Sequence, residues 1–201
     1  MYRILQRLIG LHLFVINSRP LDGSRAAATT AAVPDGEHAR RVVEADWPGV
    51  CAEPQADISR EFLDAALARG DVCIGYFVGT ALVSYFWCGF SRVPAQAGLE
   101  VCVPSGYSYA YKALTVPDHR GRHLQQILTE VNDAMLINAG LRHNIEYIEV
   151  DNYAQLKASA RYGNTTLGQA GYFRWGPYVH PFRTRGVARV GFAFAAFANK
   201  K

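Results

Sequence analysis

A strand, a helix and a second strand follow one another between residues 106 and 150, and this run limits the fold more than any other part of the sequence. The stretch 106–116 is rich in aromatic and β-branched residues, and Pro117, which cannot donate to a sheet ladder, ends it. Apolar residues then recur with the helical period from residue 122 to residue 138. The sequence IEYIEV, residues 145–150, predicts the second strand. Such a βαβ unit has a right-handed crossover and two parallel strands.

Basic residues and a glycine stand at the expected start of this helix: Arg120, Gly121 and Arg122, followed by His123. The first four N–H groups of a helix have no partner within the helix and lie at the positive end of its dipole. Positive side chains are unfavourable there unless an anion binds among them. The ligand-binding end of a βαβ unit is formed by the carboxyl ends of its strands. We therefore expect an anion site here, with a solvated turn as the alternative interpretation.

The residues before this unit predict a helix and a hairpin. Apolar residues recur with helical spacing between residues 58 and 70. The stretch 72–90 is rich in β-branched and aromatic residues and is interrupted by Val78-Gly79-Thr80, where glycine can adopt the positive φ of a tight turn. Two antiparallel strands are therefore expected, one on each side of this turn.

We expect three regions along the chain. Residues 1–21 predict a helix (2–9) and a strand (11–16) that pack on the domain. Residues 22–39 are small and polar and are interrupted by glycine and proline, which is typical of an exposed, mobile linker. Residues 40–201 predict the main domain.

The composition is that of an ordinary globular chain, since the 201 residues are 50% hydrophobic and 19% charged. The net charge of +4 is dispersed and no apolar run reaches the length of a membrane span, so we expect neither a nucleic-acid nor a membrane partner. The start of the chain resembles a secretory signal, but His12 interrupts its apolar segment, and we expect a cytoplasmic protein. The four cysteines lack zinc-ligand spacing, which favours reduced core thiols and no metal.

The βαβ unit resembles one family, the GCN5-related N-acetyltransferases (GNAT). A strand ending in Val116-Pro117 is followed by Arg-Gly-Arg-x-Leu opening an amphipathic helix, and then by a strand ending in Asp-Asn with a short helix beyond. The similarity covers about residues 58–175. It implies an α/β (α+β) fold, in which a mixed, mostly antiparallel twisted sheet with a central βαβ acetyl-CoA-binding unit is flanked by helices.

The resemblance also implies where acetyl-CoA binds as cosubstrate. Family members hold its pyrophosphate on the backbone N–H groups of an Arg/Gln-x-x-Gly-x-Gly/Ala loop. Arg120 fits the first position, whereas His123 and Gln125 replace small residues, and their side chains would narrow the approach of a phosphate to the backbone. Asn152 is the expected contact to the pantetheine arm, with a helix cap as its alternative role. The cofactor-binding residues implied are Leu114, Thr115, Val116, Arg120, Gly121, Arg122, His123, Leu124, Gln125 and Asn152.

Acetyl transfer to an amine requires a base and an acid beside the reacting carbon. Several relatives use a carboxylate on the first strand of the βαβ unit and a tyrosine. The strand 106–116 has no carboxylate here, and the candidate base is Glu149 on the following strand, which also carries Glu146. The family tyrosine falls near Ser159 or Ala160, so that the candidate acid, Tyr162, is displaced by a few positions. A packed helix residue is the alternative role of Tyr162.

We therefore expect an N-acetyltransferase that moves an acetyl group from acetyl-CoA to an amine by direct transfer. Its partner would be the amine of a small molecule or a peptide, and association into a homodimer is left open. The alternative is a non-catalytic GNAT-like module with a regulatory or assembly role. His123, Gln125 and the missing strand carboxylate suggest that alternative.

Overall fold

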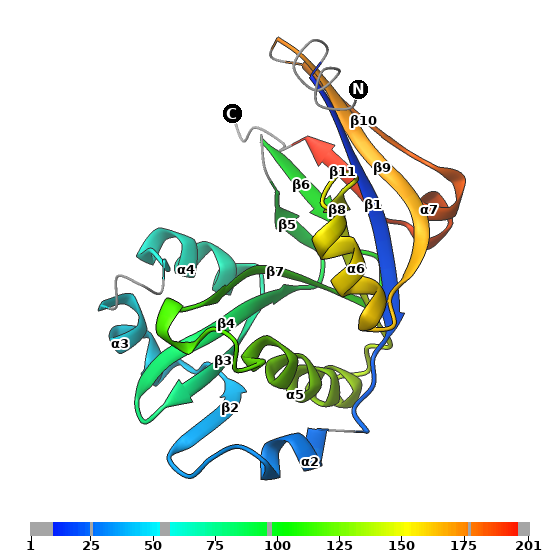
Figure 1. Ribbon diagram of the computed structural model, residues 1–201. Helices are drawn as coiled ribbons and strands as arrows, with labels where there is room; N and C mark the ends of the chain where they lie inside the picture. Colours follow the sequence, from blue (N-terminus) through cyan, green and yellow to red (C-terminus); the bar gives the residue numbers. More distant parts are fainter. Residues whose placement is uncertain (1–9, 25, 53–56, 96–97, 177, 197–201) are drawn as a thin grey trace. The chain divides into compact units, whose positions relative to one another are not determined.

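The protein is mixed α/β, with a large, mostly antiparallel sheet flanked by helices, as the sequence predicted (Figure 1). The computed structural model describes residues 10–24, 26–52, 57–95, 98–176 and 178–196. The helix expected over residues 2–9 lies outside this part of the chain. Contacts divide the chain into two compact units, which are described separately. Unit 1 comprises Met1–Pro20, Phe90–Tyr109 and His143–Lys201, and unit 2 comprises Leu21–Gly89 and Ala110–Arg142.

The sheet of unit 1 has the strand order β10-β9-β1-β8-β7 (Figure 1). Strand β1 (Leu11–Pro20) occupies the range 11–16 where a strand was expected, and it continues four residues further. It pairs antiparallel with both β8 (His143–Glu149) and β9 (Thr165–Trp175). A strand from the start of the chain therefore lies between two strands from its second half. Phe14 and Ile16 of β1 are buried in the core of this unit.

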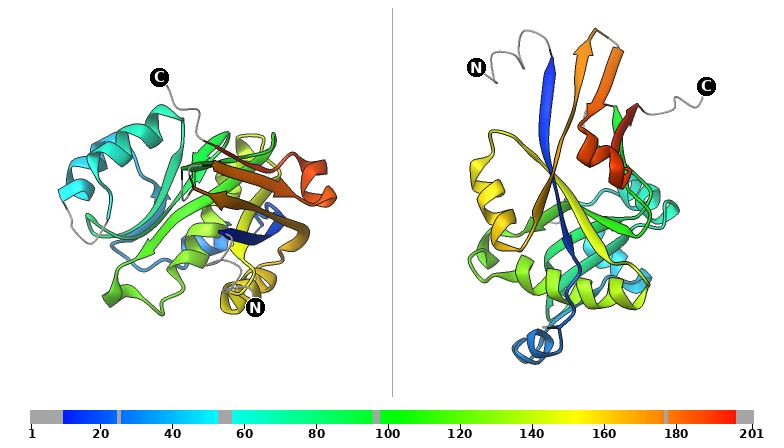
Figure 2. Two further views of the ribbon diagram at one scale, coloured as in Figure 1. Left: turned by 90° about the horizontal axis from the view of Figure 1, so that it is seen from above. Right: turned by 90° about the vertical axis from the view of Figure 1, so that its right-hand side faces the viewer.

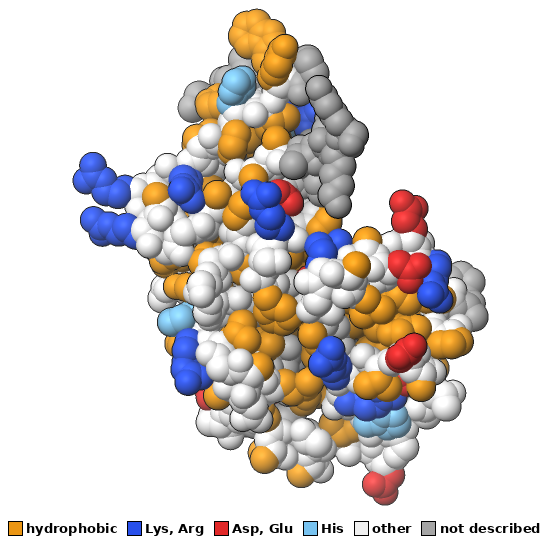
Figure 3. Space-filling model, turned by 180° about the vertical axis from the view of Figure 1, so that it is seen from behind, with side chains coloured by type: hydrophobic (Ala, Val, Ile, Leu, Met, Phe, Trp, Pro, Cys, Tyr) orange, Lys and Arg blue, Asp and Glu red, His pale blue; other side chains and the backbone are white. Residues whose placement is uncertain are grey.

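The remaining elements of unit 1 form a second sheet, two helices and a hairpin. The three-stranded sheet has the order β11-β6-β5. Strand β10 pairs antiparallel with β9, and the side chains of Trp175 and Tyr178 beside their turn are 82% and 68% exposed. Figure 3 shows hydrophobic side chains at the tip of this hairpin, at the top of the view. These elements are β5 (Arg92–Pro94), β6 (Leu99–Cys102), α6 (Tyr153–Arg161), β10 (Tyr178–Arg183), α7 (Arg185–Val190) and β11 (Ala193–Ala196).

The sheet of unit 2 contains the later part of β7 (Tyr107–Thr115), followed by β4 (Ala81–Gly89), β3 (Val72–Val78) and β2 (Glu37–Arg41). The predicted hairpin is confirmed, because β3 and β4 pair antiparallel around Gly79, which has a φ of +58°. Helix α5 covers one face of this sheet, and α3 and α4 cover the other (Figure 2). The three helices are α3 (Trp47–Ala52), α4 (Arg60–Ala68) and α5 (Leu124–Asn138).

The core of unit 2 lies between α3, α4 and the strands. The rings of Trp47 and Trp87 stack with centroids 5.5 Å apart, and Phe62 meets Trp87 edge-on. Ser59 caps α4 by accepting a hydrogen bond from the N–H of Phe62 at 3.1 Å, as expected for a serine in that position. Burial of Leu63 on the inner face of α4 follows from the helical spacing seen in the sequence.

Residues 22–39, which the sequence predicted to be an exposed linker, contain helix α2 (Ala26–Ala31) and the start of β2. The physical reason is that alanine has the highest helix propensity of all residues, so a small-residue stretch is also a good helix. The hydroxyl of Thr29 donates a hydrogen bond to Glu130 of α5, which holds α2 against that helix. No residue of α2 is buried.

The predicted parallel βαβ unit is confirmed, because β7 and β8 pair in parallel over Tyr107–Tyr109 and His143–Ile145. This pairing stops there, although β7 continues to Thr115 and β8 to Glu149. Helix α5 begins at Leu124 and not at residue 122, because the preceding residue adopts a left-handed conformation.

Two further expectations concern the cysteines and the helices. None of the four cysteines, all within the described ranges, forms a disulfide, and Cys73 and Cys88 are buried. Within the described ranges, no helix combines the length and apolar character that a membrane crossing needs.

Candidate functional site

The turn between β7 and α5 has an unusual backbone. Strand β7 ends at Thr115, the N–H of Val116 donates to the carbonyl of Val83 at 3.0 Å, and Pro117 opens a 3₁₀ helix, η3 (Pro117–His119). Gly121 has a φ of +79°, and a Cβ built at this residue would meet nothing within 4 Å. The positive φ requires a residue such as glycine, and the empty surroundings leave the backbone open to a ligand.

The N-terminus of α5 offers a row of backbone donors. The N–H groups from Gly121 to Gln125 have no acceptor in the part of the chain that the structure describes, whereas those of Gln126 and Ile127 both donate to the carbonyl of His123. His123 occupies the N-cap position with a φ of +58°, and its side chain makes no capping hydrogen bond. N–H groups without an acceptor at the positive end of a 15-residue helix have the geometry that suits an anion.

The two arginines of the turn are both held by other groups. Nε of Arg120 donates to the carbonyl of Thr115 at 3.2 Å. Arg122 forms an ion pair with Glu37 of β2, with 2.6 Å between guanidinium and carboxylate, and donates to Nδ1 of His119 at 3.0 Å. Arg122 thus lies beside the donor row with much of its charge compensated by Glu37.

Tyr76 completes this network from β3. Its hydroxyl donates to Oε2 of Glu37 at 2.6 Å. The hydrogen bonds from Tyr76 and Arg122 lower the pKa of Glu37, while burial and the neighbouring carboxylate raise the pKa of Tyr76 to about 12. Glu37 is therefore ionised and Tyr76 neutral at physiological pH.

The side chain of Gln125 points to the sheet, and its N–H remains in the donor row. Its amide nitrogen donates to Oγ of Ser84 at 2.9 Å, to the carbonyl of Leu114 at 3.0 Å and to the carbonyl of Tyr85 at 3.1 Å. The expectation that this side chain narrows the approach to the backbone is therefore wrong, because backbone and hydroxyl acceptors of β4 and β7 hold it. Leu124 is buried, and the side chain of His123 is exposed.

The other candidate site residues belong to unit 1. Asn152 caps α6, because its Oδ1 accepts a hydrogen bond from the N–H of Gln155 at 3.1 Å. Tyr162 is the C-cap residue of the same helix and is 49% exposed. Glu149 is partly buried at the end of β8, where its charge raises the pKa of His12 against the larger lowering effect of burial.

Ser159 is one of the two residues, with Ala160, near which the family resemblance places a tyrosine, and it is 2% exposed. Its hydroxyl donates to the carboxylate of Glu146 and accepts a hydrogen bond from Nδ2 of Asn17 at 3.0 Å. The hydroxyl of Thr166 in turn donates to Oδ1 of Asn17. This network ties α6 to β1, β8 and β9, and it uses the donor and one acceptor position of the Ser159 hydroxyl.

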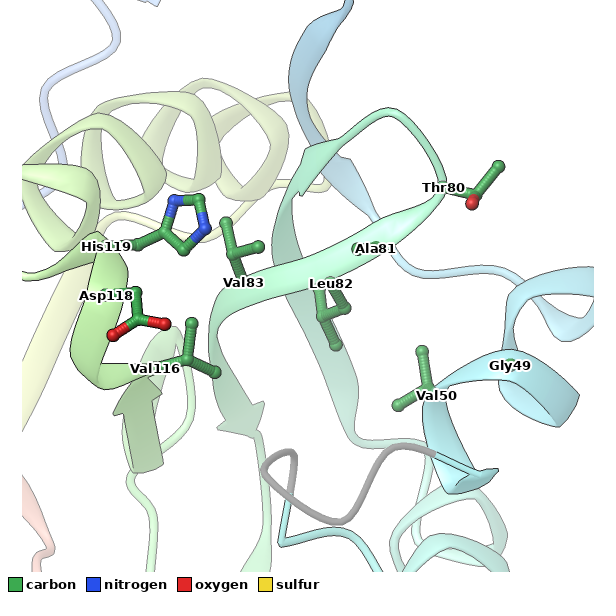
Figure 4. Close-up of a pocket in the computed structure, with 9 residues that line it drawn as sticks. All are labelled: Gly49, Val50, Thr80, Ala81, Leu82, Val83, Val116, Asp118 and His119. Atoms are coloured by element: carbon green, nitrogen blue, oxygen red, sulfur yellow. The ribbon is translucent and has the colours of Figure 1, made fainter.

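A pocket of about 400 Å³ lies in unit 2 beside the turn after β7 (Figure 4). It is lined by residues 49–50 of α3, by Thr80 and residues 81–83 at the start of β4, and by Val116, Asp118 and His119. Asp118 and His119 were not predicted as site residues, and they occupy the two positions between Pro117 and Arg120. Two adjacent polar, ionisable residues beside the expected anion loop were the available signal. Among the described residues, no group of three or more His, Cys, Asp or Glu side chains could hold a metal ion.

Comparison with known proteins identifies the fold. No protein-family model and no curated protein matches the chain. A GCN5-related glucosamine N-acetyltransferase region of a fungal multi-domain GH3 β-N-acetylglucosaminidase matches 90% of this chain and 22% of that chain, with a TM-score of 0.55 and 10% identity. An X-ray structure of a Drosophila protein matches 83% of this chain and 52% of that chain, with a TM-score of 0.51 and 14% identity.

A GNAT family acetyltransferase from Brucella melitensis in complex with acetyl-CoA matches 80% of this chain and 88% of that chain, at a TM-score of 0.45 and 13% identity. The match to the fungal N-acetyltransferase region, with its TM-score of 0.55, shows that the chain has the fold of the GCN5-related N-acetyltransferases. It spans about half of the length of the Drosophila protein, at 52%, and less of the fungal enzyme, at 22%.

Proposed function

We propose that this protein is an N-acetyltransferase that transfers an acetyl group from acetyl-CoA to an amine of a small molecule or peptide. One observation carries the proposal: the N–H groups from Gly121 to Gln125 have no acceptor among the described residues and lie at the N-terminus of α5. The oxygens of a pyrophosphate are the acceptors that such a row of donors takes. The shared fold with the fungal N-acetyltransferase region supports the same function.

The residues of the turn fit the phosphates of acetyl-CoA. Gly121 leaves the backbone open, Arg120 keeps its terminal guanidinium nitrogens for an anion, and Arg122 adds a second positive group beside the loop. Leu114, Thr115 and Val116, at the end of β7, are proposed to bind the pantetheine arm. Asn152 uses Oδ1 to cap α6, which leaves its amide nitrogen to donate to that arm.

Acetyl-CoA supplies the activated acetyl group, and direct transfer requires a base and an acid from the protein. The lone pair of the amine nitrogen forms a C–N bond with the acetyl carbon, and the C–S bond breaks with its electron pair going to sulfur. Glu149 is the proposed base that takes the proton from nitrogen, and Tyr162 is the proposed acid that protonates the thiolate. The half-exposed side chain of Tyr162 and the partly buried carboxylate of Glu149 are both accessible to solvent.

The first test is calorimetric titration of the full chain with acetyl-CoA, together with thermal melting. Binding to the native state alone stabilises a protein by about 2.7 kcal/mol at a ligand concentration of 100 Kd, so a clear rise in Tm is expected. A panel of amines is then screened for release of free CoA thiol. An unchanged Tm at millimolar acetyl-CoA would contradict the proposed function.

A second candidate function is that of a non-catalytic module with a regulatory or assembly role. The observation in its favour is that no tyrosine occupies position 159 or 160, near which the resemblance places one, and that the hydroxyl of Ser159 is hydrogen-bonded to Glu146 and Asn17. Acetyl-CoA binding without amine-dependent thiol release across the panel would favour this second function. Replacing Tyr162 with Phe separates the two, since loss of turnover with unchanged acetyl-CoA affinity supports catalysis.

A further inference from the structure

The pocket beside the turn after β7 has walls of aliphatic side chains. Val50, Leu82, Val83 and Val116 line it, and all four are at most 8% exposed. Figure 4 shows Val116, Asp118 and His119 on one side, Val50 on the other, and Leu82 and Val83 from β4 between them. A volume of about 400 Å³ suits a small molecule and lies in the usual range of ligand sites.

One carboxylate of the pocket has no partner. The carboxylate of Asp118 has no hydrogen bond or ion pair with any residue that the structure describes. Arg122 donates a hydrogen bond to Nδ1 of His119 at 3.0 Å, since a guanidinium has no acceptor. The charge of Arg122 is in turn compensated by Glu37 at 2.6 Å.

An unpaired carboxylate beside buried aliphatic side chains selects a particular chemical class. A cation can form a charge-assisted hydrogen bond with the carboxylate of Asp118, and water screens this interaction less beside apolar side chains than in bulk solvent. An aliphatic body gains from contact with the valine and leucine side chains. An anion of the same shape is repelled by Asp118, and a neutral alcohol lacks the ionic contact.

We propose that this pocket binds the acyl acceptor, and that the acceptor is a small primary amine with a compact aliphatic body whose ammonium pairs with Asp118. Its identity as an acceptor rests on the proposed acetyl transfer, whereas its binding does not. The same turn that presents the donor row with Gly121 to Gln125 also carries Asp118 and His119. The pocket and the anion site are therefore formed by one segment of unit 2.

The test uses the full chain and three probes of one shape: cyclohexylamine, cyclohexanol and cyclohexanecarboxylate. Binding is followed by a ¹H–¹⁵N NMR titration, in which shifts at Leu82, Val83 and His119 locate the probe. We expect cyclohexylamine to bind at least tenfold more tightly than the alcohol and the carboxylate not to bind. Asp118→Asn should remove the preference for the amine. The matched control is Asp35→Asn, which changes an exposed aspartate outside the pocket.

Acetyl-CoA affinity, measured by calorimetry on the same variants, separates this proposal from the proposed function. If cyclohexylamine shifts the pocket residues but acetyl-CoA does not bind, the pocket is confirmed as an amine site and the acetyltransferase function is wrong. If acetyl-CoA binds and the amine and alcohol bind equally, or Asp118→Asn leaves amine binding unchanged, the pocket proposal is overturned while the proposed function stands.

Discussion

Two helices in this protein begin in opposite ways. Helix α6 in unit 1 begins at Asn152, whose side chain accepts a hydrogen bond from the N–H of Gln155. Helix α5 in unit 2 begins at His123, whose side chain caps nothing. Both helices follow a strand of the same βαβ unit, and neither has an acidic residue in its first turn. The difference between them is the cap.

A cap stabilises a helix by about 1 kcal/mol, so an uncapped helix gives up stability that a Ser, Asp or Asn at one position would supply. The uncapped end of α5 keeps its N–H groups free for an acceptor from outside the chain, and Gly121 keeps their surroundings open. The capped end of α6 has one of its donors already satisfied. The contrast supports a capping role for Oδ1 of Asn152 at the start of α6 and the proposed anion site at the start of α5.

The largest expected effect comes from Gly121→Asp. A carboxylate in the turn would face the phosphates in a partly desolvated site, and we expect the Kd for acetyl-CoA to rise about a hundredfold, equivalent to about 2.7 kcal/mol. Calorimetry measures this change, and far-UV circular dichroism checks that the fold is intact.

Gly140→Asp is the matched control for this variant. Gly140 follows the other end of α5, has a φ of +88° and also has nothing within 4 Å of a built Cβ. The two substitutions therefore impose the same backbone strain and the same charge at opposite ends of one helix. Equal affinities of Gly121→Asp and Gly140→Asp for acetyl-CoA would place the anion site elsewhere.

The next effect concerns stability and compares the two N-cap residues directly. Asn152→Ala removes the cap of α6 and should lower the free energy of unfolding by about 1 kcal/mol, a fall in Tm of about 2–4 °C for a chain of this size. His123→Ala removes no hydrogen bond and should change stability by less than about 0.5 kcal/mol. Chemical denaturation of both variants measures the difference. Asn152→Asp, whose carboxylate can still cap the helix, should retain the stability of the parent. Equal losses of unfolding free energy in Asn152→Ala and His123→Ala would show that the two helix starts do not differ in capping.

Much of unit 2 could be predicted from the sequence because its signals are local. The turn at Gly79 and the strand before Pro117 depend on backbone preferences of single residues, and the burial of Leu128 in α5 depends on helical spacing. Helix α2 was missed because alanine is compatible with both a linker and a helix. What decides between them is the hydrogen bond from Thr29 to Glu130, a residue 101 positions away.

The arrangement of unit 1 depends on pairing that no local pattern contains. The apolar residues of β1 predicted a strand. Its place between β8 and β9, however, depends on distant partners: Val15 lies opposite Ile148 of β8 and Gln169 of β9. The register of distant strands follows from the whole sheet and not from the residues of one strand. A strand near the start of the chain could therefore be predicted, but not its neighbours.

The candidate site also combines features that the local sequence predicts with contacts between residues far apart in the sequence. Arg120 and Gly121 could be selected because a basic turn between a strand and a helix is a local feature. The direction of the Gln125 side chain and the hold of Glu37 on Arg122 could not, because their partners lie 41 and 85 positions away along the chain. Such contacts decide which donors and charges remain for a ligand.

The smallest expected effect tests Glu37, the carboxylate that pairs with Arg122 before the start of α5. The pKa of Glu37 is lowered from 4.5 in the folded state, first by the hydrogen bond from Tyr76 and then by that from Arg122. The ion pair therefore stabilises the fold above pH 4.5, and this stabilisation is lost as the pH falls through the lower folded pKa. Glu37→Gln should lower Tm slightly at pH 7, and the difference from the parent should shrink towards acid. Asp35→Asn, at a carboxylate without an ion pair among the described residues, should show no such trend. If the difference in Tm between Glu37→Gln and the parent stays constant from pH 7 to pH 3, the ion pair between the Glu37 carboxylate and Arg122 does not stabilise the fold.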